Sequence, residues 1–495
     1  MLTITNINYL DLLCLTGVTI GVYLVKQVVI KKNPAPYPPG PRGWPLIGNI
    51  LDIPHIKPWL TFSAWGQKYG DITHIRVLGR HIIVLNSVKT AVEMMDRKSI
   101  VYSDRPVLPM SGELQRKNLH RVIGNRAAVD VYNQVGEVET HRFLQRVLAK
   151  PDRLREHVRH TVGAVILRIS YGYEVKENND PFVDLANRVT THASQATAPG
   201  AFMVDILPFL AKVPAWFPGA GFKRIAREWR GTLEEMVSAP HEFVKDQMVA
   251  GVAPVSFTSN LLEGGDVSAE KEHIVKWSAF SIYAGGTETT VSALYSLFLA
   301  MTLFPDVQKK AQAEIDAVVG PDRLPSFADR DSLPYTEALA KEVLRWNVIL
   351  SSGFPHCVAE DDIHNGYYIP KGSLVLPNIW FMLNDPQTYT NPSQFNPERF
   401  LAKDGNEPEM DPRTVCFGFG RRICPGLHLA DASVWISAAM SLAVFDISKV
   451  VENGVEITPE VEPLPGTASH PKPFKCSIKP RSATALGLIE QDANY

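Results

Sequence analysis

The spacing of apolar residues along the chain predicts a mainly helical protein with a small β-sheet region. The pattern typical of strands is clearest in three short segments, 72–77, 81–85 and 367–372. The period of a helix is clearest in 277–303, 307–319 and 427–445. Because helical segments dominate from about residue 140 to 350 and strands are few, we expect one mainly α-helical domain.

The first 32 residues have the character of a membrane anchor. Residues 12–25 carry no charge, but a membrane span needs about 20 apolar residues. Extending the run to 8–30 gives a workable span in which Lys26 reaches the interface. Two lysines follow directly, so the positive-inside rule places the remainder of the chain in the cytosol. We expect 1–32 to be a retained single-pass anchor; a buried core helix and a cleaved signal peptide remain alternatives.

The anchor is followed by a segment, 33–48, that is dense in proline. Such a composition excludes a helix or a central strand and favours a stiff, extended hinge. We expect this hinge to set how the domain sits on the membrane, and a linker without a geometrical role is the alternative. The remainder, 49–495, has no repeat, no low-complexity tract and no second linker, so we expect one catalytic domain.

Composition and charge exclude several classes of protein. Lys and Arg number 50 against 52 Asp and Glu, so a nucleic-acid-binding protein that works by bulk charge is excluded. Five cysteines are few and odd in number, which argues against a secreted disulfide framework. The sequence therefore directs attention to a single special thiol.

That thiol is Cys424, which lies in the segment FGFGRRICPG that begins at Phe417. Glycines such as Gly420 let backbone N–H groups approach a sulfur closely, and Pro425 is suited to starting a helix. A helix N-terminus and nearby arginines lower the pKa of a thiol and favour thiolate, the form that binds metal. No second Cys or His stands at zinc spacing, whereas Arg422 suits the propionates of an iron porphyrin. The alternative is a small buried hydrophobic residue.

The pattern F-x-x-G-x-R-x-C-x-G resembles the haem-binding loop of the cytochrome P450 superfamily at every fixed position. The resemblance implies the cytochrome P450 fold, haem b (iron protoporphyrin IX) as cofactor and Cys424 as the ligand of its iron. It further implies that Phe417, Gly420 and Arg422 help to bind the cofactor. His356, next to a position where relatives often have arginine, is expected to be another cofactor-binding residue.

A second set of residues agrees with this resemblance. Glu342 and Arg345 share one face of a helix, which alone would indicate a solvated surface pair. Together with Arg399 they resemble the buried Glu-Arg-Arg network of the superfamily. The network implies a structural role, namely to hold the segment that presents Cys424.

A third set lies in the segment AGGTETT, residues 284–290, within a long apolar helix. Two adjacent glycines cost about 2 kcal/mol of helix stability relative to alanine, so a compensating role is expected. We interpret Glu288 and Thr289 as catalytic: the threonine holds water or peroxide beside the dioxygen site, and the glutamate relays protons from solvent. The alternative is a packing kink in which Thr289 bonds back to its own helix.

The resemblance covers nearly the whole chain after the anchor, and it is to the fungal microsomal type, similar to O-methylsterigmatocystin oxidoreductase-like monooxygenases. It implies insertion of one oxygen atom from O2 into a hydrophobic substrate, in secondary metabolism and at the endoplasmic reticulum membrane. No dinucleotide fingerprint is present, so NADPH electrons are expected from a separate cytochrome P450 reductase. We expect Arg413, Arg421 and Arg422 to form part of its docking face.

The sequence departs from the family pattern at one place. The W-x-x-x-R motif, whose side chains hold a haem propionate in relatives, is absent, and compared with the family pattern about twenty residues are expected to be deleted near 114–119. Cys357 stands where relatives often have arginine. We therefore expect weakened haem retention, with partial compensation from basic residues that remain nearby: Arg116, Lys117 and Arg121.

Two alternatives to the monooxygenase remain. One is a haem-poor, inactive variant of the same fold with a binding or regulatory role. The other is an O2-independent haem-thiolate isomerase or dehydratase, which the acid-alcohol pair disfavours. The substrate itself is not readable, but the candidate pocket segments are mostly apolar or small. They are 197–209, Phe280, Ala284 and 351–354.

Overall fold

The computed structural model describes residues 33–492 except for short gaps. The gaps are 55, 106–124, 198–201, 203, 205–211, 265–266, 403–404, 406 and 465–467. The expected anchor, the expected deletion near 114–119 and the basic residues around it therefore lie outside the described residues, as does most of the candidate pocket segment 197–209.

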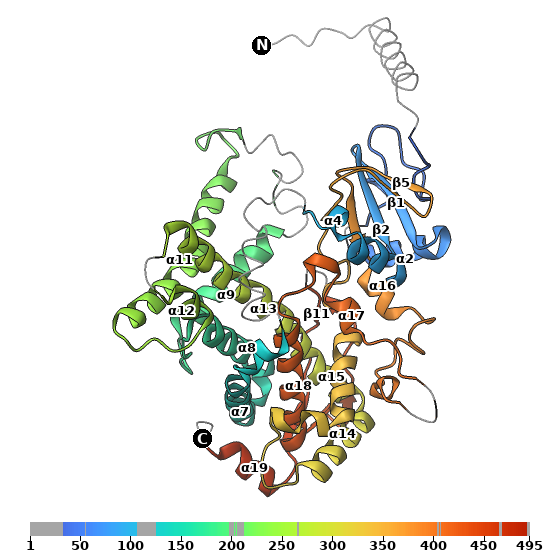
Figure 1. Ribbon diagram of the computed structural model, residues 1–495. Helices are drawn as coiled ribbons and strands as arrows, with labels where there is room; N and C mark the ends of the chain where they lie inside the picture. Colours follow the sequence, from blue (N-terminus) through green and yellow to red (C-terminus); the bar gives the residue numbers. More distant parts are fainter. Residues whose placement is uncertain are drawn as a thin grey trace, which may run out of the picture.

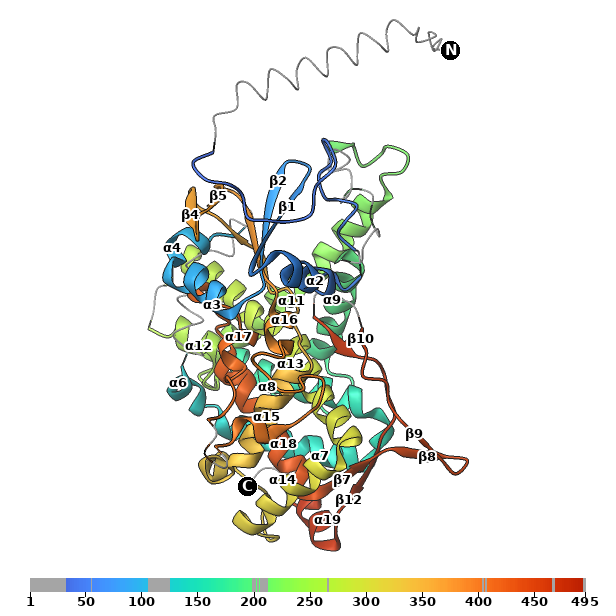
Figure 2. The same cartoon turned by 90° about the vertical axis from the view of Figure 1, so that its right-hand side faces the viewer.

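The described chain is mainly helical, which confirms the expected fold class. Figures 1 and 2 show a sheet-containing lobe next to the point where the described chain begins, and a larger helical lobe beside it. The long helices are α7 (Asn133–Ala149), α8 (Leu154–Tyr171), α11 (Gly221–Val249), α13 (Ala269–Leu303) and α18 (Leu427–Val444). Of these, α13 runs through the middle of the molecule and packs against both α8 and α18.

The other helical segments of the described residues are α9 (Pro181–Thr197), which is as long as α7, and a set of shorter ones. The α-helices are α2 (Pro58–Tyr69), α3 (Val88–Ala91), α4 (Ser99–Tyr102), α6 (Arg126–Asp130), α9 (Pro181–Thr197), α12 (Phe257–Leu262), α14 (Pro305–Val318), α15 (Pro334–Trp346), α16 (Ile379–Asn384), α17 (Arg413–Cys416) and α19 (Ala483–Glu490). One π-helix, η1 (Val92–Arg97), and four 3-10 helices complete the set: η2 (Pro151–Arg153), η4 (Phe327–Ser332), η5 (Pro397–Phe400) and η6 (Gly420–Arg422).

The main sheet has four strands in the order β1-β2-β6-β3. They are β1 (Ile72–Val77), β2 (Arg80–Leu85), β6 (Leu374–Pro377) and β3 (His356–Cys357). β1 and β2 are antiparallel with Ile75 opposite Ile82, and β2 continues in parallel with β6. The sheet thus joins residues from both ends of the sequence. Four two-stranded sheets come from β4 (Asp362–His364), β5 (Tyr367–Ile369), β7 (Phe445–Ser448), β8 (Val450–Glu452), β9 (Val455–Ile457), β10 (Pro463–Leu464), β11 (His470–Pro471) and β12 (Ser477–Pro480).

The elements expected from the apolar pattern are present with shifted boundaries. The strands at 72–77, 81–85 and 367–372 correspond to β1, β2 and the shorter β5, and the three expected helices correspond to α13, α14 and α18. α13 begins earlier than expected because the Ser268 side chain caps it by accepting from the backbone N–H of Lys271. α18 ends at Val444 because Phe445 starts β7, which pairs with β12.

Within the described residues, α18 alone is long and apolar enough to cross a membrane by itself. Most of this helix is buried in the protein, so it is a core helix. α13 and α14 pass the same test only as a pair bent by 105°.

The proline-rich segment lies along the sheet. The backbone N–H groups of His74 and Tyr368 donate to the carbonyls of Pro39 and Pro36, at 2.9 Å and 2.7 Å. The ring of Tyr37 stacks on that of His74 with centroids 5.0 Å apart. A Cβ on Gly40 would lie 1.9 Å from the His74 carbonyl oxygen, so only glycine permits this approach. These contacts hold the proline-rich segment against the β-sheets of the domain.

Candidate active site

The loop that carries Cys424 is built from tight turns between α17 and α18. The backbone N–H of Cys424 donates to the carbonyl of Phe417 at 2.8 Å, and that of Ile423 donates to Gly420 at 3.1 Å. Gly420 has a φ of +59°, and a Cβ there would lie 2.0 Å from the carbonyl oxygen of Met95. The loop therefore rests directly on η1, and this close approach requires glycine.

Cys424 is an exposed residue, although protein atoms surround its thiol closely. Burial raises the pKa of this thiol, and only a hydrogen bond from the Gly426 N–H opposes the shift. The expectation that nearby arginines lower the pKa is therefore wrong. The physical reason is that Arg422 is directed elsewhere, because its Nε donates to the carbonyl of Ser103 at 2.8 Å. A metal at the sulfur would itself supply the charge that deprotonates the thiol.

Three basic side chains gather near this loop from distant parts of the sequence. Arg105 donates to the carbonyls of Phe354 and Pro355 at 2.7 Å and 2.8 Å. Burial, followed by the charge of Arg422, lowers the pKa of Arg105 to about 10. Burial and the charge of Arg105 likewise lower the pKa of His356 to about 4. Each of the three groups is thus close enough to another to be affected by its charge.

Within the residues that the structure describes, neither Arg105 nor Arg422 forms an ion pair with a carboxylate. A group of cations without acidic partners is suited to bind an anion. Together with the thiol of the exposed Cys424, the donor set fits a metal-porphyrin with acidic side groups. Arg105 was not predicted from the sequence. A β-bridge between Asp104 and Cys357 brings it to this site, and no local sequence motif indicates that pairing.

Glu342, Arg345 and Arg399 lie together in the interior. Arg345 binds both carboxylate oxygens of Glu342, at 2.7 Å and 2.8 Å, and Arg399 Nε donates to the same carboxylate at 3.3 Å. The side chains of Glu342 and Arg345 are fully buried, so the alternative of a solvated surface pair does not hold. Arg399 also pairs with Glu409 at 2.6 Å. These contacts join α15 to η5 and to the segment that leads to α17.

The two adjacent glycines of α13 have different surroundings. A Cβ on Gly286 would lie 2.9 Å from Cδ1 of Ile166, so this glycine lets α8 approach closely. A Cβ on Gly285 would meet nothing within 4 Å, and the neighbouring Ala284 is exposed although it lies in the middle of the helix. Gly285 therefore borders open space, whereas Gly286 serves packing.

Thr289 and Glu288 follow these glycines and point to different partners. The Thr289 hydroxyl donates to the carbonyl of Gly285 at 2.7 Å, which is the back-bond of the packing alternative. Its oxygen retains lone pairs that can accept a further hydrogen bond. Glu288 is held by Arg159 of α8 at 2.6 Å and 3.2 Å and lies 3.4 Å from Nε2 of His470.

Sequence reasoning missed both partners of Glu288. Burial lowers the pKa of His470, and the charge of Glu288 opposes that shift. Arg159 lies in α8 and His470 in β11, so only the packing of these elements on α13 brings them to the carboxylate. The single available signal was that a charged residue inside an apolar helix needs a partner.

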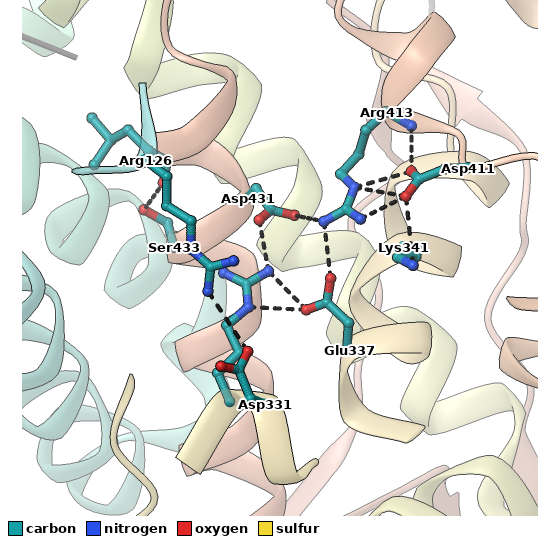
Figure 3. A network of polar contacts seen from close by, with 10 residues as sticks. Arg126, Asp331, Glu337, Lys341, Asp411, Arg413, Asp431 and Ser433 are labelled. Carbon is teal, nitrogen blue, oxygen red and sulfur yellow. Dashed lines mark hydrogen bonds and ion pairs between the residues drawn. The ribbon is translucent and has the colours of Figure 1, made fainter. Parts of the chain in front are cut away.

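One expected role of an arginine is contradicted by its surroundings. Arg413 contacts carboxylates on three sides, from Asp411, Glu337 and Asp431 (Figure 3). It is therefore committed within the protein and is not available for a docking face. Arg422 is half-buried and bonded to Ser103, while Arg421 is exposed.

The chain is similar to known proteins over most of its length. The family model described as Cytochrome P450 matches residues 38–478. Cytochrome P450 monooxygenase 208 from Postia placenta is 53% identical, with 92% of each chain covered. Cytochrome P450 monooxygenase claR from Ampulloclitocybe clavipes is 47% identical, with 97% of this chain and 93% of the relative covered. Cytochrome P450 monooxygenase ppsD from Aspergillus oryzae is 40% identical, with 97% and 94% covered.

The alignment with claR also bears on the length of this chain. It runs over 502 positions and covers 97% of 495 residues, which is about 480, so about 20 aligned positions have no counterpart here.

Proposed function

The chain belongs to the cytochrome P450 family of monooxygenases, and from this premise we propose that it is a haem-thiolate enzyme that oxidises a hydrophobic organic substrate. The observation that carries the proposal is the exposed Cys424, whose loop also contains Arg422, a cation close to Arg105 and to the neutral imidazole of His356. A thiol ligand and a site for acidic side groups are the two features that this cofactor requires.

In the proposed arrangement Cys424 would hold the iron, and Arg105, Arg422 and His356 would hold the propionates. Phe417 and Gly420 shape the loop, because the Phe417 carbonyl accepts from the Cys424 N–H and Gly420 lets the loop rest on η1. Haem b, when bound, supplies activation of O2, and the thiolate's electron donation favours cleavage of the O–O bond.

Thr289 and Glu288 are proposed to manage protons on the α13 side. The Thr289 oxygen has acceptor lone pairs beside the open space at Gly285, so it can hold a water there. Glu288 is partly exposed and bonded to Arg159 and His470, so it can pass a proton from the surface towards Thr289 when one of these contacts opens.

The overall reaction requires two electrons and two protons besides O2. One oxygen atom enters a C–H or C=C bond of the substrate, and the other leaves as water. We propose that NADPH is the electron source and that a separate flavoprotein, NADPH-cytochrome P450 reductase, delivers the electrons. Of the arginines considered for its docking face, Arg421 is exposed on η6, close to the thiol loop.

We further propose a single-pass anchor in the endoplasmic reticulum membrane with a cytosolic catalytic domain. Exposed apolar side chains support contact with a membrane: Leu46 is 96% exposed and Trp216 is 80% exposed. Figures 1 and 2 both place the start of the described chain and the loop before α11 at the same end of the molecule. The first turns of α11 add exposed cations, Arg224, Arg227 and Arg230, which suit anionic headgroups.

The test is an optical one followed by a turnover assay. The full-length protein, expressed in membranes and loaded with haem, is reduced and exposed to carbon monoxide. A long-wavelength Soret band of the thiolate type is expected, together with substrate oxidation that requires both NADPH and the reductase. A screen with fatty acids, terpenoids, steroids and polycyclic aromatics then identifies the substrate class. An imidazole-type spectrum would overturn the proposal.

A second candidate function is favoured by the positions missing from this chain relative to claR. If the missing segment holds a propionate in relatives, the chain is a haem-poor variant with a binding or regulatory role. Each lost charged hydrogen bond is worth about 1.5–3 kcal/mol, or roughly tenfold or more in affinity. Haem occupancy is compared before and after the segment is restored; equal, full occupancy in both forms excludes this candidate. An O2-independent isomerase or dehydratase would turn over without NADPH.

A further inference from the structure

Four charged residues form a closed ring of alternating sign beside the thiol loop, and we refer to them as the charge ring: Arg330, Glu337, Arg413 and Asp431. Arg413 Nη1 donates to Glu337 at 2.9 Å and to Asp431 at 3.0 Å. Arg330 Nη2 closes the ring with bonds to the other oxygens of the same two carboxylates, at 2.7 Å and 2.6 Å. Figure 3 shows Arg413, Glu337 and Asp431 pointing toward one another from different elements.

The charge ring connects the two ends of the loop that carries Cys424. Arg413 begins α17, before the loop, and Asp431 lies in the second turn of α18, after it; the two are 18 residues apart. Arg330 in η4 and Glu337 in α15 fasten both ends to the same part of the helical lobe. The segment between the two ends includes the thiol and the glycine-rich turns.

The surroundings of the ring make its contacts strong. Arg330 is 8% exposed and lies over the Trp435 ring, with 5.4 Å between the guanidinium carbon and the centroid. Arg413 is held further by both oxygens of Asp411, which also lies 3.5 Å from Lys341. Removing one member leaves the residues of opposite charge without a countercharge at a place where water has little access. The loss of folding free energy is therefore larger than for an exposed ion pair.

The loop needs such support because its glycine-rich backbone can adopt many conformations. Gly418 and Gly420 both have positive φ, at +79° and +59°, and glycine loses more conformational freedom on folding than any other residue. The buried network of Glu342, Arg345 and Arg399 holds the segment upstream of α17. Among the described residues its hydrogen bonds do not extend to α18, so they do not fix the far end of the loop.

We infer that the charge ring closes the base of the thiol loop and thereby sets the position of the Cys424 sulfur. Its four members are positioning residues. The inference deepens the proposed function, because the sulfur that it places is the proposed iron ligand. The role itself does not depend on oxygen chemistry, so it can be tested on the protein with or without haem.

The experiment measures hydrogen exchange in the full-length protein by mass spectrometry. The variant is Asp431→Asn, which keeps the shape of the side chain and removes its charge. Amides of the peptide spanning 417–427, including the Cys424 N–H, are expected to exchange at least about tenfold faster, because local opening no longer breaks two charged hydrogen bonds. Asp316→Asn is the matched control: Asp316 pairs with Arg481 at 2.6 Å but is half exposed and distant in sequence.

A second readout separates positioning from general stability. In the haem-loaded protein the thiolate-type fraction of the carbon-monoxide spectrum should fall for Asp431→Asn well below the unfolding temperature, and should not fall for Asp316→Asn. Arg413→Lys keeps the positive charge but loses the planar guanidinium group that donates to several carboxylates, so it should give an intermediate exchange rate. Unchanged loop exchange in Asp431→Asn, even with a lower unfolding temperature, would overturn the inference. That result would leave the role of Cys424 as ligand untouched, which Cys424→Ser tests separately.

Discussion

The loop that carries Cys424 and the α13 segment that carries Thr289 are held by different kinds of contact. On the thiol side, arginines and carboxylates from α15, η4, η5, α17 and α18 form two ionic networks with distances of 2.6–3.3 Å. On the α13 side, one glycine packs against Ile166, its neighbour borders open space, and Thr289 donates to the carbonyl of Gly285 in its own helix. The first region is fixed by two extended ionic networks, and the second by helix packing and the contacts of one carboxylate, Glu288, with Arg159 and His470.

This difference agrees with what each side has to do in the proposed enzyme. A ligand atom must stay within a narrow range of positions from its metal, so the backbone around it is tied from several directions. The opposite side has to admit oxygen, water and substrates. It therefore has open space next to α13 and side chains with few tertiary contacts. Four predictions test this comparison, from the largest expected effect to the smallest.

The largest effect is expected from Cys424→Ser. Serine lacks the sulfur that donates charge to iron, so the thiolate-type Soret band of the reduced carbon-monoxide complex should be lost entirely. Cys357→Ser is the control, because Cys357 lies in β3 and has no proposed bond to iron. A thiolate-type band in the Cys424→Ser protein would contradict the comparison, since another sulfur would then be the iron ligand.

Next is Glu342→Gln on the thiol side. The change leaves the guanidinium group of Arg345 buried without a countercharge, whereas Arg399 keeps its pair with Glu409; the loss should cost about 3–5 kcal/mol of unfolding free energy. Urea unfolding followed by circular dichroism measures it. Asp316→Asn, in an exposed pair, should cost less than about 1 kcal/mol. Similar losses in both variants would mean that burial adds nothing to this network.

The two glycines of α13 offer a matched pair on the opposite side. Alanine at either position gains the same intrinsic helix stability, about 1 kcal/mol. Gly285→Ala should keep that gain, because its Cβ meets open space, whereas Gly286→Ala should be about 1–3 kcal/mol less stable than Gly285→Ala because its Cβ meets Ile166. Thermal unfolding of both variants is the measurement. Equal stability of the two variants would show that Ile166 of α8 moves away from the added methyl group without a measurable loss of stability.

The smallest effect is expected from pH. Burial, opposed by Glu288, lowers the pKa of His470 below 6.5, so between its folded pKa and 6.5 the unfolded chain binds more protons. Unfolding free energy should therefore fall as pH drops below about 6.5, and His470→Asn should reduce this slope by its own share, because other histidines such as His74 and His356 also have a lowered pKa. Urea unfolding between about pH 7 and pH 5 measures the slope.

The pair of Asp411 and Arg413 on the thiol side should not respond in the same window of pH, in contrast to His356, whose pKa is lowered to about 4. Burial alone would raise the pKa of Asp411, but hydrogen bonds from Arg413 lower it below its ordinary value. The stability that this group contributes is lost only as pH falls through that lowered pKa, below about 4. An Asp411→Asn protein with the same slope as the parent between about pH 7 and pH 5 would sharpen the comparison; a changed slope would contradict it.

Local sequence was sufficient for the fold class and for the residues with local signatures. Helical period and strand alternation depend on which face of a segment is buried, so α13, α18 and the β1–β2 hairpin could be predicted. The glycine pattern around Cys424 reflects a backbone that must turn tightly, and Glu342 with Arg345 reflects helical spacing. Each of these signals is contained in a few consecutive residues.

Tertiary structure alone decided which charges meet. Arg105 reaches Arg422 and His356 through a bridge between β3 and a distant loop, and His470 reaches Glu288 because β11 packs on α13. Arg413 looked like a surface cation in the sequence and proved to be enclosed by carboxylates. The physical reason is that a charge acts over a few ångströms of space irrespective of sequence separation, so its partner, its burial and its pKa are set only when distant segments pack together.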